Sequence, residues 1–361
     1  MKIVVTGTRG IPNIMGGVET HCEELFPRIA AKGYDVTLIR RTSYVQDNFR
    51  ESKGVKLVDI TTPKKKSFEA VIHTLKAIWA AKFRFCADIV HIHAIGPAIV
   101  TPFARLLGLK VVFTHHGHDY DRDKWGKAAK IMLKFGERMG CRFANEVIVI
   151  SEVINNNIKK RYRREDAHLI YNGVPAPNFI HSTNYLDELG VKSEKYIFAM
   201  GRFVPEKNFH QLIKAFLSLS DHDEYKLVLA GDVDFEDEYS RRLKKLALEN
   251  GVILTGFIKG KKLHELLTHA STFVLPSSHE GLPISLLEAM SYDLPIIVSD
   301  IPANLEIGLP PDFYFPVGNE EKLMEKLMKI ITEKPTKFKY QLDNYCWENI
   351  AKQTIKVYEK I

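Results

Sequence analysis

Glu280 and Glu288 lie eight residues apart on either side of the turn Gly281-Leu282-Pro283-Ile284, which opens a predicted helix. A carboxylate in the loop before the helix can accept hydrogen bonds from sugar hydroxyls. A carboxylate two turns along can hold ribose hydroxyls, while the amides of the first turn favour phosphate. Taken alone, the two glutamates could equally be a helix cap and a surface charge.

A basic pair, Arg202 and Lys207, lies in the segment Gly201–Asn208 that follows the predicted strand Tyr196–Met200. Arginine presents a fork of donors and lysine a compact charge, and together they can neutralise a diphosphate leaving group. An exposed basic loop is the plain alternative. The position of the pair at a strand-to-helix turn favours the phosphate interpretation.

Glycines bracket the first strand-to-helix connection, which runs from Gly7 to Gly16 and Gly17. Glycine lets a ligand approach the backbone, and the following helix N-terminus favours an anion. The spacing is not GxGxxG, and the second strand ends in Arg40-Arg41 where an NAD-binding domain carries an acid. This turn therefore does not by itself distinguish a ligand loop from a simple turn, and an NADP-dependent oxidoreductase is a remote alternative.

The histidine-rich segment Thr114–Asp119 follows the predicted strand Lys110–Phe113, at the end where open α/β sheets bind ligands. His91 and His93 end the neighbouring strand, so a metal cluster is conceivable. The loop histidines lack i, i+4 spacing, however, and no cysteine joins them. We therefore expect a ligand or catalytic role for at least one loop histidine and no metal site; His91 and His93 fit ordinary strand-end residues equally well.

Alternating strands and helices must position these residues. Apolar runs that fit strands buried on both faces recur through both halves, and the turn-rich segment Tyr171–Pro177 separates the two series. The pattern predicts two Rossmann-like, doubly wound α/β domains facing one another across a cleft. The predicted ranges are 1–175 for the first domain, 176–340 for the second, and 341–361 for a helical tail.

Composition is that of a globular protein with about two domains: 361 residues, 45% hydrophobic and 26% charged. The longest apolar runs fall far short of the roughly 20 residues that cross a bilayer. The sequence begins with a strand and no signal-peptide pattern, and its four cysteines lack CxxC spacing. These features predict a cytoplasmic location.

Charge is unevenly distributed. Residues up to Pro175 hold 29 Lys and Arg against 17 Asp and Glu, whereas the remainder holds 22 against 27. The first half has no RNP-type strand, Cys/His finger or helix-turn-helix, which argues against nucleic acid. Two predicted helices, Lys64–Phe85 and Lys124–Phe143, combine basic and apolar flanks. They fit peripheral contact with an anionic membrane, at the inner face of the cell membrane, about as well as a solvated basic face.

The sequence resembles glycosyltransferase family 4, the retaining GT-B enzymes, and within it the bacterial polysaccharide, rhamnosyltransferase-like branch. The matching motifs run in family order over almost the whole chain and make a very specific combination. They are Gly16–Thr20, Val90–His93, Thr114–Asp119 with Arg122–Trp125, Tyr171–Val174, Gly201–Asn208, Gly231-Asp232, Glu280–Glu288 and Ser299–Pro302. Phe338–Ile361 resembles the last helices of the family, which cross back onto the N-terminal domain.

The resemblance implies a role for each matching residue. Arg202 and Lys207 would bind the donor diphosphate, Glu280 the donor sugar and Glu288 the ribose. His116 would be the active-site histidine, with His115 and His118 as the neighbouring candidates. The other implied donor contacts are Gly16, Gly17, Gly281, Leu282, Pro283 and Ile284, with Phe257 and Ile258 at the base; His93, His115, His118 and Asp119 would lie on the acceptor side.

The resemblance also implies that no metal or other cofactor is required, because Arg, Lys and helix dipoles carry the leaving-group charge. The DxD triplets at Asp121, Asp221 and Asp232 lie in settings that the GT-B interpretation already explains. The expected reaction transfers a sugar from a nucleoside-diphosphate donor to a lipid-linked glycan with retention of anomeric configuration. The resemblance favours a dTDP-deoxysugar as the donor. The alternatives are a nucleotide-sugar epimerase or hydrolase and a non-catalytic nucleotide-sugar-binding protein.

Overall fold

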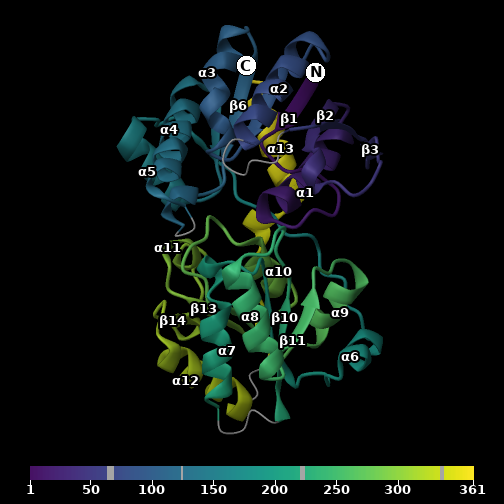
Figure 1. The fold of residues 1–361 in the computed structure, drawn as a ribbon, viewed down its shortest axis with the longest axis vertical. Helices are drawn as coiled ribbons and strands as arrows, with labels where there is room; N and C mark the ends of the chain where they lie inside the picture. Colours follow the sequence, from purple (N-terminus) through teal and green to yellow (C-terminus); the bar gives the residue numbers. More distant parts are fainter. Residues whose placement is uncertain (63–68, 123–124, 220–223, 334–336) are drawn as a thin grey trace. The chain divides into compact units, whose positions relative to one another are not determined.

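The computed structural model describes residues 1–62, 69–122, 125–219, 224–333 and 337–361. The chain forms two compact units, shown in Figure 1. Unit 1 contains Met1–Gly173 and Asn344–Ile361, and unit 2 contains Val174–Asp343. The first boundary lies two residues before the predicted one, and the second lies three residues after it.

Unit 1 is built on an eight-stranded sheet of order β3-β4-β2-β1-β5-β6-β7-β8. All neighbours pair in parallel except β3 and β4, which are antiparallel. The strands are β1 (Lys2–Thr6), β2 (Asp35–Arg41), β3 (Glu51–Ser52), β4 (Val55–Ile60), β5 (Ile89–His93), β6 (Lys110–His115), β7 (Glu146–Val149) and β8 (His168–Leu169). The strand order reverses between β1 and β5, which is the point where doubly wound sheets bind ligands.

The helices of unit 1 connect these strands and cover the sheet. They are α1 (Gly17–Ala30), α2 (Glu69–Phe83), α3 (Thr101–Leu106), α4 (Lys127–Phe143), α5 (Glu152–Tyr162) and α13 (Trp347–Tyr358). The predicted helices Lys64–Phe85 and Lys124–Phe143 correspond to α2 and α4. Lys64, Lys65, Lys66 and Phe68 lie outside the described residues.

Helix α13 belongs to unit 1, although it ends the chain: it is the yellow helix that packs beside α1 among the purple and blue elements of Figure 1. Trp347, Ile350 and Tyr358 are buried in the core that the sheet shares with α1. Trp347 lies against the backbone of Gly173, where a Cβ atom would come within 2.6 Å of the indole. The glycine at this position therefore lets the C-terminal helix anchor on the body of unit 1.

Unit 2 repeats the same architecture with a six-stranded parallel sheet of order β11-β10-β9-β12-β13-β14. Its strands are β9 (Tyr196–Met200), β10 (Lys226–Ala230), β11 (Ile253–Gly256), β12 (Thr272–Leu275), β13 (Ile296–Ser299) and β14 (Tyr314–Phe315). Its helices are α6 (Asn184–Leu189), α7 (Phe209–Leu217), α8 (Glu238–Glu249), α9 (Lys261–His269), α10 (Ile284–Ser291), α11 (Pro302–Leu305) and α12 (Glu320–Glu333). Every residue of β9 and β12 is buried, as expected for central strands covered on both faces.

The two-domain, doubly wound α/β prediction is confirmed, and the predicted strands Lys110–Phe113 and Tyr196–Met200 agree with β6 and β9 to within two residues. The segment 178–195, which lacks periodicity in the sequence, contains the short helix α6. Six residues are too few to display a 3.6-residue repeat, so the hydrophobic pattern could not reveal this helix.

Candidate functional site

In unit 2, the loops after β9 and β12 are tied together at the point where the strand order reverses. The backbone N–H of Ser278 donates to the carbonyl of Glu206 at 2.9 Å, and the Asn208 side-chain amide donates to the carbonyl of Pro276 at 3.1 Å. Both loops follow the carboxyl ends of adjacent parallel strands. Residues from two distant parts of the sequence are thereby held at one edge of the sheet.

Lys207 and Glu280 form an ion pair across these two loops, with Nζ 2.5 Å from Oε1. Their side chains are only 15% and 12% exposed, so the pair is partly shielded from water. Lys207 lies over Gly201, where a Cβ atom would come within 3.2 Å of the lysine Cε. The missing side chain at Gly201 therefore leaves the room that the lysine occupies.

The other predicted donor contacts of unit 2 lie on the same and neighbouring loops. Arg202 is half-buried in the loop that carries Lys207. Pro283 precedes α10 and has no side-chain group that can cap the helix. The N–H groups of Leu286 and Leu287 donate to the Pro283 carbonyl, so the amides at the very start of α10, those of Ile284 and Ser285, are the ones that can face an anion. Glu288 is half-buried on α10, and Phe257 is exposed after β11, followed by the half-buried Ile258.

In unit 1, the connection from β1 to α1 is folded around the buried carboxylate of Glu19. This carboxylate accepts from the Thr8 hydroxyl at 3.1 Å and pairs with the Arg9 guanidinium at 2.8 Å. Gly16 has φ +146°, and a Cβ atom there would come within 2.2 Å of the Glu19 carboxylate. At Gly17, a Cβ atom would meet nothing within 4 Å, so the first residue of α1 borders open space.

Three histidines from three elements meet beside this connection: His21 on α1, His93 at the end of β5 and His116 after β6. Nδ1 of His93 lies 2.8 Å from Nε2 of His116, and the His21 ring meets the His116 ring edge-on at 4.8 Å. His21 and His93 are buried, whereas His116 is half-buried. His116 therefore presents the accessible edge of the group.

The remaining loop histidines contact a buried acid on α4. The backbone N–H of Gly117 donates to His115 Nδ1, so His115 Nε2 carries the proton and donates to Glu137 at 2.8 Å. The hydroxyls of Tyr120 and Tyr162 also donate to Glu137, at 3.2 and 2.6 Å. These contacts fix the loop that carries His116.

This arrangement changes the roles expected for two histidines. His93 and His115 have no exposed side-chain surface, so in this conformation they cannot contact an acceptor. His93 instead contacts His116 directly, and His115 contacts Glu137, which fixes the loop that carries His116. His118 is also buried, and its ring lies 3.4 Å from Glu137. Asp119, the remaining residue predicted on the acceptor side, pairs with Arg122 at 3.0 Å.

The three histidines that meet beside the β1–α1 connection are uncharged at neutral pH. Burial lowers the pKa of His21 to about 4, although its hydrogen bond to Asn172 acts in the opposite direction. Burial, reinforced by neighbouring imidazoles, lowers the pKa of His93 and His116 well below 6.5. For Glu137, burial acts to raise the pKa, but the hydrogen bond from His115 holds it below the ordinary value.

Arg40 does not provide a free site for a nucleotide phosphate. Its guanidinium is fully buried and pairs with Asp59 at 2.6 Å and Asp47 at 2.8 Å. The sequence position of Arg40 is one where an NADP-binding domain would contact the 2′-phosphate. Here its guanidinium instead forms ion pairs that hold the edge of the sheet. This removes Arg40 from the Arg40-Arg41 pair that suggested an NADP-dependent oxidoreductase.

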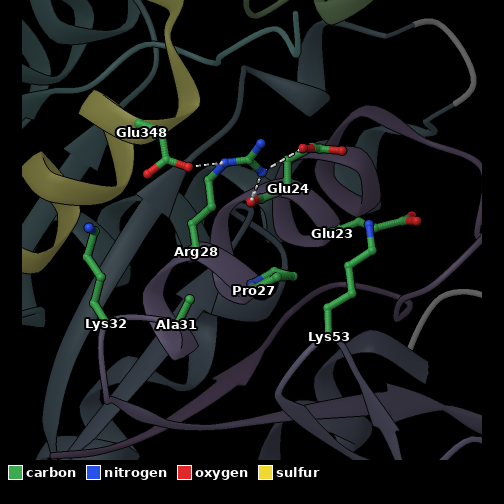
Figure 2. A pocket seen from close by; sticks show the side chains of 8 residues that line it. All are labelled: Glu23, Glu24, Pro27, Arg28, Ala31, Lys32, Lys53 and Glu348. Atoms are coloured by element: carbon green, nitrogen blue, oxygen red, sulfur yellow. Dashed lines mark hydrogen bonds and ion pairs between the residues drawn. The ribbon is translucent and has the colours of Figure 1, made fainter.

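A hollow of about 450 Å³ lies on the outer side of α1, and none of the predicted site residues lines it. Figure 2 shows Arg28 between Glu24 and Glu348, at 2.7 and 3.1 Å. Lys32 and Lys53 add positive charge to the same walls. The Arg28–Glu348 pair joins α13 to α1, so we assign this hollow a structural role.

Two Rossmann-like domains with their loops at the carboxyl ends of parallel strands are the architecture of GT-B glycosyltransferases. The family described as "Glycosyltransferase Family 4" matches residues 15–176, and the family described as "Glycosyl transferases group 1" matches residues 183–352. The chain therefore belongs to glycosyltransferase family 4 and has the GT-B fold.

Individual relatives agree with this family. An uncharacterized glycosyltransferase of Methanocaldococcus jannaschii is 24% identical over 99% of this chain and 98% of its own length. A UDP-Gal:alpha-D-GlcNAc-diphosphoundecaprenol alpha-1,3-galactosyltransferase of Escherichia coli is 27% identical over 84% of this chain and 81% of its own. Among solved structures, Anabaena HepE in complex with UDP and glucose has a TM-score of 0.81 at 18% identity, with full coverage of both chains.

Proposed function

We propose that this glycosyltransferase moves a sugar from a nucleoside-diphosphate sugar to a lipid-linked glycan in bacterial polysaccharide biosynthesis. The observation that carries the donor half of the proposal is the Lys207–Glu280 pair at the carboxyl edge of the unit 2 sheet. The acceptor half is supported by relatives such as the E. coli galactosyltransferase, whose name gives a diphosphoundecaprenol-linked sugar as its substrate.

Without a donor, each partner of the Lys207–Glu280 pair neutralises the other. A diphosphate offers Lys207 and Arg202 a stronger anionic partner, because several phosphate oxygens share the two cations. Glu280 is then free to accept hydrogen bonds from the sugar hydroxyls. The transfer rate depends on how well the enzyme stabilises the negative charge that develops on the departing diphosphate. Lys207, Arg202 and the first amides of α10 would stabilise this charge.

We propose that this charge is carried without a metal ion, since two cationic side chains and an uncapped helix N-terminus serve the same purpose. Chelation would then not lower the transfer rate. A strict requirement for Mg²⁺ or Mn²⁺ would contradict the proposal.

We propose that the transfer retains anomeric configuration by a front-side, oxocarbenium-like path in which the leaving phosphate helps deprotonate the acceptor. A double displacement needs a carboxylate nucleophile across the ring. In unit 1, the buried carboxylates of Glu19 and Glu137 are already engaged, by Arg9 and by His115. Trapping of a glycosyl adduct on Glu280 would contradict the front-side path.

The donor is proposed to be a deoxysugar nucleotide such as dTDP-rhamnose, with UDP- and GDP-sugars as the competing outcomes. A thermal-shift panel of nucleotide sugars identifies the base and the sugar before any acceptor is known. Donor turnover with and without a lipid-linked acceptor then separates a transferase from an epimerase or hydrolase, which would act at full rate on the donor alone. Binding without turnover would indicate a non-catalytic protein.

We further propose that unit 1 contacts an anionic membrane through the outer surface of α2, α3 and α4, which we call the α2–α4 face. Bulky apolar side chains are exposed there beside basic ones, and α3 packs against α4. The apolar members are Leu75, Trp79, Phe83, Phe103, Leu106, Ile131 and Phe135, and the exposed basic members include Lys76, Lys127, Lys134 and Arg138. Such a mixture suits the interface of an anionic bilayer. Among the described helices, none is long and apolar enough to span a membrane.

Liposome flotation tests the α2–α4 face with matched controls. Ile131 and Leu248 are 69% and 68% exposed in units 1 and 2, so Ile131→Ser removes apolar surface from the proposed face and Leu248→Ser removes it elsewhere. Lys134→Glu and Lys245→Glu form the corresponding charge pair. Binding to anionic vesicles should fall for the unit 1 variants alone and weaken with salt. Equal losses in both units, or no binding by the wild type, would contradict the proposal.

A further inference from the structure

Unit 1 contains two groups of side chains that have the composition of a metal site. The first, which we call the His21 cluster, is His21, His93 and His116; the second, the Glu137 cluster, is His115, His118 and Glu137. In each group the candidate ligand atoms lie within 4.8 Å of one another. The two groups differ in whether their lone pairs are already used.

In the Glu137 cluster, the ligand atoms of His115 and Glu137 are already used by hydrogen bonds. His115 uses both ring nitrogens, one accepting from Gly117 and one donating to Glu137. The carboxylate of Glu137 also accepts from the hydroxyls of Tyr120 and Tyr162. A cation here would have to displace several hydrogen bonds inside a buried network, and we assign this group a structural role.

In the His21 cluster, one nitrogen atom that would bind an ion is buried and has no partner among the described residues. Nδ1 of His21 lies 2.9 Å from the Asn172 side-chain oxygen, so it donates and leaves a lone pair on Nε2. Nε2 of His21 is buried and makes no hydrogen bond within the described parts of the chain. Buried polar atoms without partners are uncommon and ask for an explanation.

Distances between the rings match those of three imidazoles around one ion. The ring centroids lie 5.6 Å apart for His21 and His93, 4.8 Å for His21 and His116, and 5.1 Å for His93 and His116. Three histidines on a tetrahedral zinc ion with Zn–N bonds of about 2.0–2.1 Å place their centroids roughly 5 Å apart. His91, the fourth histidine nearby, uses both ring nitrogens on Tyr358 and Thr114, so it is not a further ligand.

We propose that His21, His93 and His116 bind one transition-metal cation such as Zn²⁺, with a fourth coordination position left open. Neutral imidazoles suit zinc, copper and nickel, and a set without a carboxylate disfavours Mg²⁺ and Ca²⁺. The side-chain oxygen of Asn172 would accept from the other ring nitrogen of His21 and so fix the orientation of this ring.

Binding requires only a small rearrangement. The proton shared between His93 Nδ1 and His116 Nε2 moves to the other nitrogen of its ring, and the ion takes its place between the two rings. These nitrogens, now 2.8 Å apart, would separate to about 3.3 Å, the spacing that tetrahedral angles give at Zn–N bonds of this length. His116 is half-buried, so the ion can enter from its side.

Calorimetric titration of the chelator-stripped full chain with Zn²⁺ alone tests this inference without any sugar donor. The wild type should bind one equivalent, and His21→Asn and His93→Asn should each weaken binding at least tenfold. His168→Asn is the control for surface histidines, because His168 pairs with Glu146 and lies outside both clusters. His118→Asn controls for the Glu137 cluster, and both controls should retain wild-type affinity.

Two safeguards keep the test decisive if a buried variant fails to fold. His116→Asn changes the most exposed ligand and should also weaken binding, and Co²⁺ bound to the wild type should show the strong visible absorption of a tetrahedral site. Absence of stoichiometric binding by the wild type, or equal affinity in ligand and control variants, overturns the inference. A loss confined to His118→Asn overturns it as well, since the ion would then occupy the Glu137 cluster.

Discussion

Nζ of Lys207 lies 2.5 Å from Oε1 of Glu280, although the two residues are 73 positions apart in the sequence. The loops after β9 and β12 carry them, and hydrogen bonds from Ser278 and Asn208 hold these loops together. The pair is therefore positioned by the backbone of the sheet and not by the attraction of its charges alone. It is the arrangement from which the donor chemistry can be tested.

Replacement of Lys207 by Met should reduce the transfer rate far more than it reduces stability. Loss of one cation that stabilises the departing diphosphate costs about 10²- to 10³-fold in kcat. Lys195→Met is the matched control, because Lys195 also pairs with a glutamate, at 2.7 Å, but on the exposed surface of the same unit. Single-turnover kinetics with saturating donor measure the effect. Equal rates for the two variants would remove Lys207 from the chemistry.

The two glycines that open α1 should respond differently to alanine. Gly16→Ala places a Cβ atom at positive φ and against the Glu19 carboxylate, so unit 1 should lose about 1–3 kcal/mol of stability. Gly17→Ala meets only open space and should fold normally, yet weaken donor binding if a diphosphate approaches this backbone. Thermal melts and donor titrations of both variants separate the effects. Unchanged donor affinity in Gly17→Ala would exclude a close phosphate contact there.

Glu137→Gln should lower both stability and kcat, because it removes the carboxylate that holds the His115–Tyr120 loop. Hydrogen bonds to a charged group are each worth about 1.5–3 kcal/mol, and a fall of that order in the free energy of unfolding is expected. Glu146→Gln is the control, since Glu146 also pairs with a histidine, at 2.6 Å, nearer the surface of unit 1. If Glu137→Gln melts earlier but keeps the wild-type kcat, the acid supports the fold and not the position of His116.

Acid should destabilise unit 1 between pH 6.5 and about 4. Burial lowers the pKa of His73 to about 4, assisted by the charge of Arg41, so the unfolded chain binds a proton there that the native chain does not. The free energy of unfolding therefore rises with pH across this window, by about 1.4 kcal/mol per pH unit for this histidine. All three tryptophans (Trp79, Trp125 and Trp347) belong to unit 1, so their fluorescence during urea unfolding reports this unit alone. His73→Gln should reduce the slope by one proton, and an unchanged slope would assign the pH dependence to other groups.

The sequence pattern predicted the fold well because parallel strands buried on both faces read as continuous apolar runs. It also predicted which loops would carry the candidate site, since the carboxyl ends of parallel strands share one edge. Lys207 and Glu280 were each singled out separately; only the register of β9 with β12 shows that they meet. The distance between two loops in the folded protein cannot be deduced from the number of residues that separate them in the sequence.

Residues that act from the interior escaped the sequence analysis. Glu137 lies among the basic residues of α4, and only its position one turn from Leu133 and Cys141 marks it as an acid on the buried face. His21 follows the glycine-rich motif without any pattern of its own. Trp347 and Tyr358 reach the histidines from the far end of the chain. Such contacts depend on tertiary packing, which local periodicity cannot report.

Zinc should inhibit transfer if both the metal inference and the proposed role of His116 are correct. A bound ion would occupy a ring nitrogen of His116, the accessible histidine of the His21 cluster, so His116 could no longer interact with the transferred sugar. The measurement is the zinc concentration that halves the transfer rate, with each variant normalised to its own rate without zinc. His21→Asn should raise this concentration at least tenfold, whereas His168→Asn should leave it unchanged. Stoichiometric zinc binding without inhibition would preserve the metal site and exclude His116 from the reaction, while inhibition that persists in His21→Asn would place the inhibitory ion elsewhere.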